Sequence, residues 1–338
     1  MSNISAQAQQ KMNDIHKFTA QAYGGVVGKQ YAATPTIAQT LNEKIIEDGN
    51  WFLNMINTIP VSEISGEKVF LGLSGSVTGR TDTSGANERA ASNLVDLNGD
   101  LYALKKTDSD VALRYSTIDA WAKFKNFREL YSKAVRQAIG NDRLKIGFVG
   151  ISAAADTVAV DLSDVNIGWL EQIRLYNAGA QYVLGNGTGI EPGAVVLGGV
   201  NFPNLDSLVY SALNTIEIQH REDPDLVVFV GRNVMQAAKG SYYDNQGATP
   251  TEKQVMAEKK TFDTYGGLVA YTPPFFDPDS ILVTSINNLS IYWQESSWRR
   301  QQLDNPKKDQ YEDFNTRQEG YVVEQLGKTS LVQGIEYA

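Results

Sequence analysis

The sequence predicts an α+β protein organised around one long helix. Between Ile118 and Ile139, large apolar residues recur at steps of three and four, which is the period of an amphipathic helix. Short β-like runs are scattered along the rest of the chain and do not alternate with helices as βαβ units would. With 338 residues, 42% of them hydrophobic and 20% charged, the chain is long enough for one elaborate domain or two.

The N-terminal residues 1–33 are expected to form a detachable arm. Four apolar residues stand at roughly helical spacing among polar ones: Ile4, Met12, Ile15 and Phe18. Gly24, Gly25 and Gly28 then interrupt the helix and supply a flexible hinge. A second helical pattern begins near Thr36, within residues 34–60.

Two β-like stretches, Val61–Leu73 and Asp110–Tyr115, enclose a long connection. The connection from Gly75 to Asn98 is rich in Gly, Ser, Thr and Asn, a composition that is uncommon inside a compact domain and often marks a partner-supported loop. Because an isolated hairpin is only marginally stable, such an extended arm needs a neighbouring molecule to lie on.

The long helix is expected to run from about Ile118 to Leu144, roughly 40 Å at ~1.5 Å per residue. Its exposed positions are predicted to be mostly basic, although the net charge of the chain is -9: Lys123, Lys125, Arg128, Lys133, Arg136, Arg143 and Lys145, against Asp119, Glu129 and Asp142. These cations could contact DNA without sequence preference. The alternative, which we favour, is a solvated face or one paired with acidic neighbours.

The remaining chain predicts alternating short helices and strands. Helices are expected at Ile167–Tyr176, Leu205–Ile218 and Asn233–Lys239, and strands at Leu226–Val230, Leu268–Tyr271, Ile281–Thr284, Leu289–Trp293, Tyr321–Val323 and Ser330–Ile335. A charged stretch from Asp304 to Glu319 is expected between the last β runs.

Residues with catalytic or metal-binding chemistry are few. The absence of Cys excludes thiolate sites and disulfides, and His16 and His220 stand in unrelated contexts. Gly185–Gly189 lacks the spacing of a dinucleotide loop. The carboxylates of Glu222–Asp225 and Asp277–Asp279 are better explained as turn or capping residues than as cation ligands. We therefore expect no cofactor and no metal. No signal peptide or membrane span is recognisable, so synthesis in the cytoplasm is expected.

Ordered motifs along most of the chain resemble the major capsid proteins of Peduovirus-type (P2-like) tailed bacteriophages. The motifs are Thr34–Leu41, Pro60–Lys68, Arg80–Thr83, Glu88–Arg89, Arg114–Ala122, Val165–Leu170, Glu222–Arg232, Asn288–Tyr292, Arg299–Arg300, Asn305–Lys307 and Tyr321–Glu324. A run of motifs in one order is more specific than any single motif.

The resemblance implies the Hong Kong 97 capsid fold and a division of the chain. This division has an N-terminal arm (1–33), an N-terminal helix segment (34–60), an extended loop (61–116), a peripheral domain with the spine helix (117–200), an axial domain (201–285) and further peripheral strands (286–338).

The implied function is a shell subunit, without catalysis, that forms pentamers and hexamers around double-stranded DNA in the virion. The implied partners are other copies of the chain, a scaffolding protein, a maturation protease and the portal protein, with the chain made in a bacterial host and possibly encoded by a prophage.

Three groups of residues follow as candidates. The cleavage that removes the arm is placed at Val26, Val27, Gly28, Lys29, Gln30, Tyr31, Ala32 or Ala33, because glycines and small residues gather there. The loop motifs suggest intersubunit contacts at Arg80, Thr81, Asp82, Glu88 and Arg89. The candidates for DNA contact are Lys123, Lys125, Arg128, Lys133 and Arg136.

Two alternatives stay open at this point. An encapsulin-like cellular compartment would use the same fold, but it would need neither a removable arm nor genome packaging. A soluble α/β enzyme would have to use Asp223 or Asp225 at a sheet edge, without a convergent His, Cys or phosphate loop.

Overall fold

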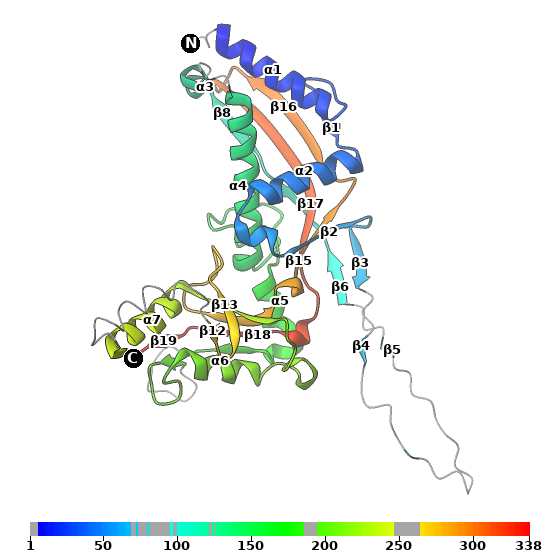
Figure 1. Cartoon of the computed structure of the whole chain (residues 1–338). Coiled ribbons are helices and arrows are strands. Elements are labelled where there is room, and N and C mark those ends of the chain that lie inside the picture. Colours follow the sequence, from blue (N-terminus) through cyan, green and yellow to red (C-terminus); the bar gives the residue numbers. More distant parts are fainter. Residues whose placement is uncertain are drawn as a thin grey trace, which may run out of the picture.

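The computed structural model describes residues 6–68, 72–73, 80, 95–96, 100–121, 124, 126–185, 195–246 and 264–338. Over these residues the chain forms an elongated body, with the N-terminal helix at one end and a six-stranded sheet near the C-terminus at the other (Figure 1). The α-helices in this part of the chain are α1 (Ala6–Ala22), α2 (Pro35–Asp48), α3 (Tyr115–Trp121), α4 (Phe127–Val149), α5 (Trp169–Leu175), α6 (Leu205–Leu213) and α7 (Arg232–Gln246). Short 3₁₀ helices are η1 (Trp51–Asn54), η2 (Tyr176–Gly179), η3 (Ile218–His220), η4 (Ile286–Asn288) and η5 (Leu326–Lys328).

The described strands pair into two large sheets and three short ribbons. The first sheet holds β1 (Tyr31–Ala32), β2 (Asn57–Val61), β7 (Lys105–Asp108), β8 (Val111–Arg114), β15 (Leu289–Gln294), β16 (Arg299–Asn305) and β17 (Gln310–Val323). The second holds β9 (Tyr182–Leu184), β11 (Leu226–Val230), β12 (Thr264–Tyr265), β13 (Leu268–Tyr271), β14 (Ile281–Ser285) and β18 (Ser330–Gln333). The ribbons pair β3 (Ser65–Lys68) with β6 (Asp100–Ala103), β4 (Gly72–Leu73) with β5 (Val95–Asp96), and β10 (Val196–Leu197) with β19 (Glu336–Tyr337).

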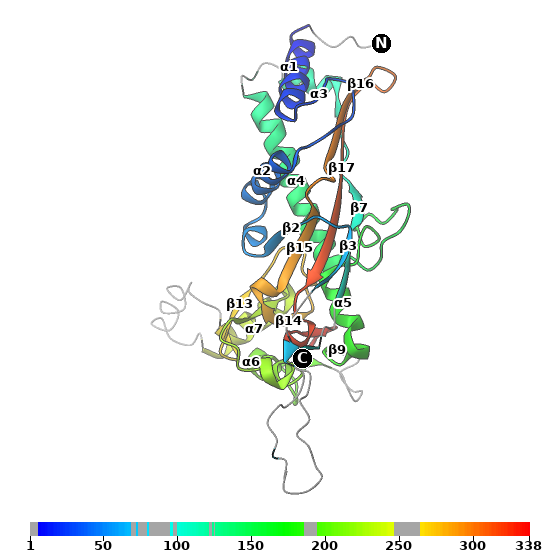
Figure 2. The ribbon, with the colours of Figure 1, turned by 90° about the vertical axis from the view of Figure 1, so that its right-hand side faces the viewer.

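Strand β17 is the central strand of the first sheet and runs along the body (Figure 2). It pairs antiparallel with β16, β8, β7 and β15 in turn. The prediction of a strand only at Tyr321–Val323 was therefore wrong, because most of the charged stretch Asp304–Glu319 belongs to β17 as well. The inward-facing polar side chains of β17 form hydrogen bonds with one another. Their charges can therefore be buried, although charged side chains are ordinarily expected to face solvent.

The long helix begins later and ends later than predicted. In place of one helix from Ile118 to Leu144, α3 ends at Trp121 and α4 runs for 23 residues from Phe127. Turn bonds from the backbone N–H of Phe124 and Phe127 join the two helices. Helix α4 ends at Val149 and is capped by Gly150, where an added Cβ would lie 2.2 Å from the carbonyl oxygen of Asn166.

The six-stranded sheet has an apolar core on each face. One core joins this sheet to α4, α5 and β17 through Phe52, Trp169, Phe229 and Tyr321, and the other lies under α6 and α7. The predicted bounds of β11 and β13 are confirmed. Helix α6 is shorter than predicted, because Thr215 and Ile216 close three-residue turns after Leu213. Strands β9 and β18 join this sheet from outside residues 201–285.

The strand at the end of the predicted loop has a different partner from the one expected. Strand β8 forms where Asp110–Tyr115 predicted it, but it pairs with β17, and β3 pairs with β6. The apolar residues of β8 explain this choice, because Val111 and Leu113 pack against separate clusters of the body. The β3–β6 ribbon leaves the side of the body, and β4 and β5 lie farther along the same direction (Figure 1).

Candidate assembly surfaces

The arm helix α1 is docked on the body by one buried face. Met12 and Ile15 pack into a cluster with Tyr115, Phe127 and Tyr311. His16 is also buried, and its ring meets the ring of Tyr311 edge to face at 5.1 Å between centroids. Burial lowers the pKa of His16 below its ordinary value of 6.5, although Asp313 and Asp304 nearby act in the opposite direction. The arm therefore has an ordered binding surface on its own subunit.

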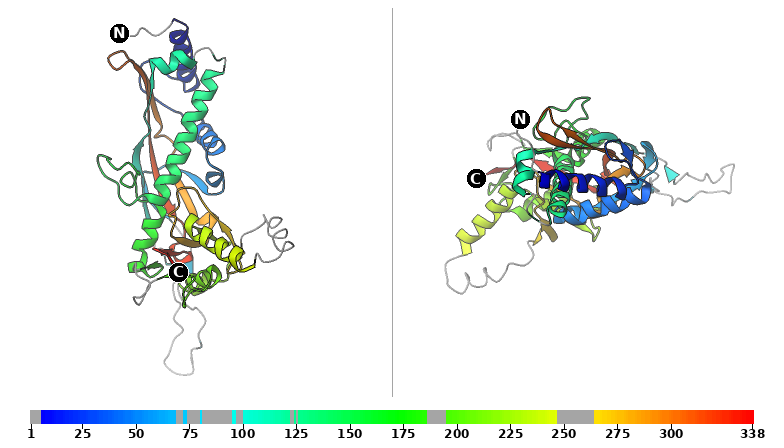
Figure 3. Two further views of the ribbon diagram at one scale, coloured as in Figure 1. Left: turned by 90° about the vertical axis from the view of Figure 1, so that its left-hand side faces the viewer. Right: turned by 90° about the horizontal axis from the view of Figure 1, so that it is seen from above.

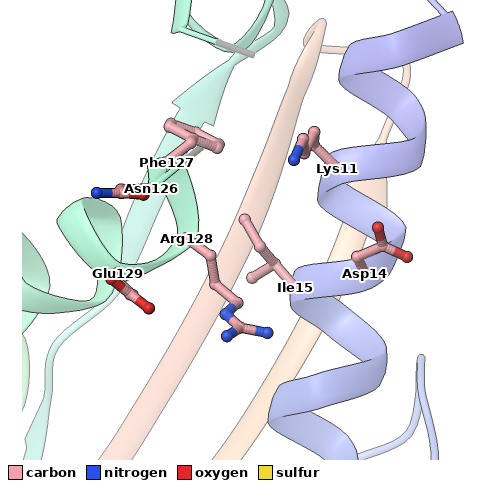
Figure 4. Close-up of a pocket in the computed structure, with 7 residues that line it drawn as sticks. All are labelled: Lys11, Asp14, Ile15, Asn126, Phe127, Arg128 and Glu129. Atoms are coloured by element: carbon pink, nitrogen blue, oxygen red, sulfur yellow. The ribbon is translucent and has the colours of Figure 1, made fainter. Parts of the chain in front are cut away.

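A cavity of about 230 Å³ lies between α1 and the first turn of α4 (Figure 4). Its lining residues are Lys11, Asp14, Ile15, Asn126, Phe127, Arg128 and Glu129. Two acidic and two basic side chains give this lining no preference for either sign of charge. At the same seam, the guanidinium of Arg128 lies 4.0 Å above the ring of Phe18. The seam thus joins the arm to the long helix.

The predicted cleavage stretch divides into two parts. Val26, Val27, Gly28, Lys29 and Gln30 are exposed or partly exposed between α1 and β1. Tyr31 and Ala32 instead form β1 and pair with Arg300 and Arg299 of β16. The backbone N–H of Ala33 donates to the carbonyl of Trp298 at 2.9 Å, and Ala33 is buried. Accessible backbone is therefore confined to the first five candidates.

The base of the arm also contacts a charged pair of the first sheet. Arg300 donates to both carboxylate oxygens of Asp313, at 2.9 and 2.5 Å, and to the hydroxyl of Tyr23 at 3.5 Å. Burial raises the pKa of Tyr31, next to this pair, to about 12. Arg300 therefore contacts the chain on both sides of the glycine hinge, at Tyr23 and at Tyr31.

Among the five candidate contacts on the extended loop, the structure places one. Arg80 is exposed, whereas Thr81, Asp82, Glu88 and Arg89 lie outside the described residues. At the base of this loop, Ile64 and Leu101 have exposed apolar side chains.

The predicted basic face of the long helix is largely engaged by the subunit itself. Arg128 stacks on Phe18, and Arg136 forms an ion pair with Asp48 of α2 at 2.6 Å. Lys133 is exposed, and Lys123 and Lys125 lie outside the described residues. Arg143 was predicted to be exposed and is fully buried, so it does not belong to this face.

Arg143 belongs to a buried ionic network that the sequence did not reveal. Its guanidinium and that of Arg317 both donate to Oε1 of Glu319, and Arg143 also donates to Oδ1 of Asn42 at 2.7 Å. Arg317 donates to Oγ of Ser109 at 2.8 Å. Burial alone would raise the pKa of Glu319, but the two guanidiniums outweigh it and hold that pKa below its ordinary value. The network connects α2, α4, β17 and the turn after β7.

The acidic clusters are occupied by structural partners. Nζ of Lys328 lies 2.9 Å from Asp223 and 2.6 Å from Asp225, which are the two carboxylates of the enzyme alternative. Asp277 accepts hydrogen bonds from Ser280 and Gln333. Within the described ranges, no group of His, Cys, Asp and Glu residues has the arrangement of a metal site. His220 pairs with Asp223, and His16 lies under the arm.

Comparison with known proteins identifies the family. The model of the family described as "Phage major capsid protein, P2 family" matches residues 8–335. The chain belongs to this family. It is 32% identical to the capsid protein of Escherichia phage P2 over 323 residues, which cover 92% of this chain and 89% of that protein. It is 28% identical to the major capsid protein of Serratia phage KSP20, with 92% and 91% covered.

Solved capsid structures agree with this assignment. A chain of the satellite phage P4 procapsid, whose structure includes the size determination (Sid) protein, has a TM-score of 0.75 and 31% identity, with 98% of both chains covered. The capsid protein of a GTA particle shares the fold at a TM-score of 0.52 and 12% identity, over 84% of this chain and 89% of that one. This P2-family protein therefore has the Hong Kong 97-type capsid fold, as the motifs implied.

The family assignment decides between the alternatives that the sequence left open. The protein is a major capsid protein and a component of the virion shell, not an encapsulin-like compartment protein. In the part of the chain that the structure describes, no helix is long and apolar enough to cross a membrane.

Proposed function

We propose that this capsid protein forms pentamers and hexamers of an icosahedral head that encloses double-stranded DNA, and that it works by assembly geometry without a catalytic site. The single observation that carries this proposal is the family match over residues 8–335. The elongated body and the ribbon that leaves its side are consistent with a subunit that reaches across its neighbours.

The proposed division of the subunit follows the ranges given above. The extended loop (61–116) reaches a neighbouring subunit through its part before β7, because β7 and β8 pair with β17 of the same subunit. The axial domain (201–285) meets other copies around the symmetry axes, and the peripheral domain contains α4. Strands β9 and β18 add to the axial sheet, so this domain draws residues from both sides of its range.

The proposed maturation step removes the arm. A scaffolding protein guides assembly of the precursor shell, a phage protease cuts between Val26 and Ala33, and the shell expands and receives DNA through the portal. The exposed residues Val26–Gln30 favour cutting before β1, because proteases cut preferentially at exposed backbone outside sheets and helices. Protein from mature particles is expected to lack Met1 to Gly25, which its intact mass would show. Retention of that segment would refute the proposal.

Non-specific contact with packaged DNA is proposed for the basic residues Lys123, Lys125, Arg128, Lys133 and Arg136. Lys133 supports it best, because it is exposed and forms no ion pair with the described residues. Arg128 and Arg136 are engaged within the subunit, which favours the alternative that much of this face is structural.

The first experiment is sedimentation and negative-stain microscopy of the recombinant chain, expressed in bacteria with and without phage scaffolding and protease genes. Closed shells or ring-shaped capsomers are expected. A discrete monomer or dimer under every condition would contradict assembly as the function. Particles recovered from a lysogen's lysate would test the further proposal that the chain is made in the host cytoplasm from a prophage.

A further inference from the structure

A loop between α4 and α5 presents apolar side chains directly to solvent. We call residues 151–165 the valine loop; it stands out from the side of the body at mid-length (Figure 3). Val158 and Val160 are 89% and 95% exposed, and Ile151 at the base of the loop is 54% exposed. Single exposed apolar residues are ordinary on protein surfaces, but three on one projecting loop mark an interaction surface.

The loop is held in one conformation by its own acidic residues. Oδ2 of Asp164 accepts hydrogen bonds from the backbone N–H of Val158 at 2.6 Å and of Ala159 at 2.9 Å. These bonds hold the pKa of Asp164 below its ordinary value. Asp161 accepts from the backbone N–H and hydroxyl of Ser163. The two valines are therefore presented by fixed backbone.

The base of the loop is fastened to the body. The carbonyl of Ser163 accepts from the N–H of Ile151 at 2.7 Å, and Lys145 of α4 donates to the carbonyl of Val160 at 3.3 Å. Leu162 has a φ of 66°, which a Leu residue rarely adopts, and its side chain packs against the main core. This unfavourable backbone conformation is retained where the chain anchors the loop and turns the neighbouring valines outward.

The charges of the loop restrict the partner. Residues 151–165 contain Asp156, Asp161 and Asp164 and no Lys or Arg. A complementary surface must bring apolar groups together with cations. Another copy of this chain carries exposed apolar groups near the start of α4, where Trp121, Phe124 and Leu130 are about half exposed, and the exposed cation Lys133 follows Leu130 by three residues.

We propose that the valine loop is a contact between subunits, in which Val158 and Val160 of one copy are buried against a second copy of the chain in the shell. The inference rests on the capsid function and adds a specific surface to it. A closed shell repeats each contact many times, so a modest apolar contact contributes strongly to assembly.

The first test uses the absence of Cys from the chain. In a Val158→Cys variant, the single thiol is labelled with a maleimide photocrosslinker, and shells of the purified protein are irradiated. Covalent pairs of this chain are expected on a denaturing gel, with the loop peptide joined to a second copy. Intact shells that yield only unlinked or internally linked chains would overturn the proposal.

The second test removes the apolar contact. A double variant, Val158→Asp with Val160→Asp, is expected to form closed shells with a yield reduced roughly tenfold or more, because every copy loses the contact. The unassembled variant should melt at the temperature of the parent chain, since both side chains are exposed in the subunit. Normal shells from the double variant would contradict the proposal.

A matched control separates apolar contact from added charge. Thr157→Asp with Ala155→Asp places two more carboxylates on the same loop, as many as the double variant adds, and removes neither valine, so shells are expected to form normally. Equal loss of shells in this control would overturn an apolar contact as the cause. If the parent chain itself formed no shells, the result would contradict the proposed assembly function as a whole. Loss of shells in the double variant alone concerns only the valine loop.

Discussion

At the scale of single residues, the buried network around Glu319 joins α2, α4, β17 and the turn after β7 inside the subunit. Oε1 of Glu319 accepts hydrogen bonds from the guanidiniums of Arg143 and Arg317. Asn42 and Ser109 accept further hydrogen bonds from the same two guanidiniums. A period-two strand normally places apolar residues inward, but β17 buries Asp313, Asn315, Arg317 and Glu319. Sequence reasoning missed these residues because polar side chains are ordinarily assigned to solvent. Their shared spacing of two is the signal that could have revealed them.

Replacing Glu319 with Gln is expected to destabilise the subunit by on the order of 3–5 kcal/mol, because two buried guanidiniums lose their counter-charge. Denaturant unfolding of the unassembled chain measures the loss. Asp48→Asn breaks the partly exposed pair with Arg136 and is the matched control, with an expected cost below about 1 kcal/mol. Similar costs for both variants would contradict the central role of the network.

Two glycine substitutions are expected to have opposite effects. An added Cβ at Gly147 would lie 2.2 Å from the buried ring of Trp169, so Gly147→Ala is expected to destabilise by about 1–3 kcal/mol. Gly240 in α7 has nothing within 4 Å of an added Cβ. Gly240→Ala should therefore stabilise by up to about 1 kcal/mol through helix propensity alone. Thermal unfolding of both variants compares the two shifts, and a loss in both would refute this account.

At the scale of elements, the apolar pattern predicted α1, α2, β11 and β13 well, because the two helices each bury one regular face and β11 is a short apolar run buried throughout. It did not predict the partner of β8, since strand pairing is decided by distant residues of β17. The break between α3 and α4 also lacked a sequence signal, because apolar residues continue at helical spacing from Trp121 through Phe124 to Phe127. The proposed cleavage stretch could be predicted only as a region, and its division into exposed and paired residues depends on the pairing of β1 with β16.

Docking of α1 is expected to weaken as the pH falls below about 6.5. The pKa of His16 is lowered by burial, so the undocked arm binds a proton more readily than the docked arm between the lowered pKa and 6.5. Asp313 and Asp304 oppose this effect, and Arg300 reinforces it. Hydrogen exchange of residues 6–22, corrected for intrinsic rates, would be compared at about pH 7.5 and about pH 5.5.

A His16→Asn variant lacks the titrating ring and serves as the control for this pH dependence. It is expected to show the same corrected protection of α1 at both pH values, whatever its absolute level. Protection of the parent helix that stays constant across this range would show that His16 has no influence on the docking of the arm.

At the scale of the whole molecule, the cores that stabilise the subunit lie in its body, and the surfaces that we propose for assembly project from it. The ion network and the apolar cores lie within the body, whereas the β3–β6 ribbon and the valine loop extend from its sides. The motifs predicted the capsid fold, but no sequence pattern located the valine loop, because its valines are exposed by backbone geometry. Folding and assembly should therefore be separable by mutation.

Deleting residues 75–98 is expected to leave a folded subunit that does not close shells. In sequence the segment lies between β3 and β6, and the two large sheets and the main apolar core are formed by residues outside it. Circular dichroism and thermal unfolding should match those of the parent chain, and negative-stain microscopy should find capsomers or free subunits. Closed particles of normal size would exclude a required role for this segment.

The sheet pairings also set the order in which the newborn polypeptide can mature on the ribosome. Strand β2 has to wait for β15, whose Ser290 pairs with Asn57, and β8 has to wait for β17. Translation adds about 5–20 residues per second, so the early strands remain unpaired for many seconds while the later ones are made. A prematurely terminated polypeptide lacks the central strand β17, so β8 and β15 are left with open edges that favour aggregation.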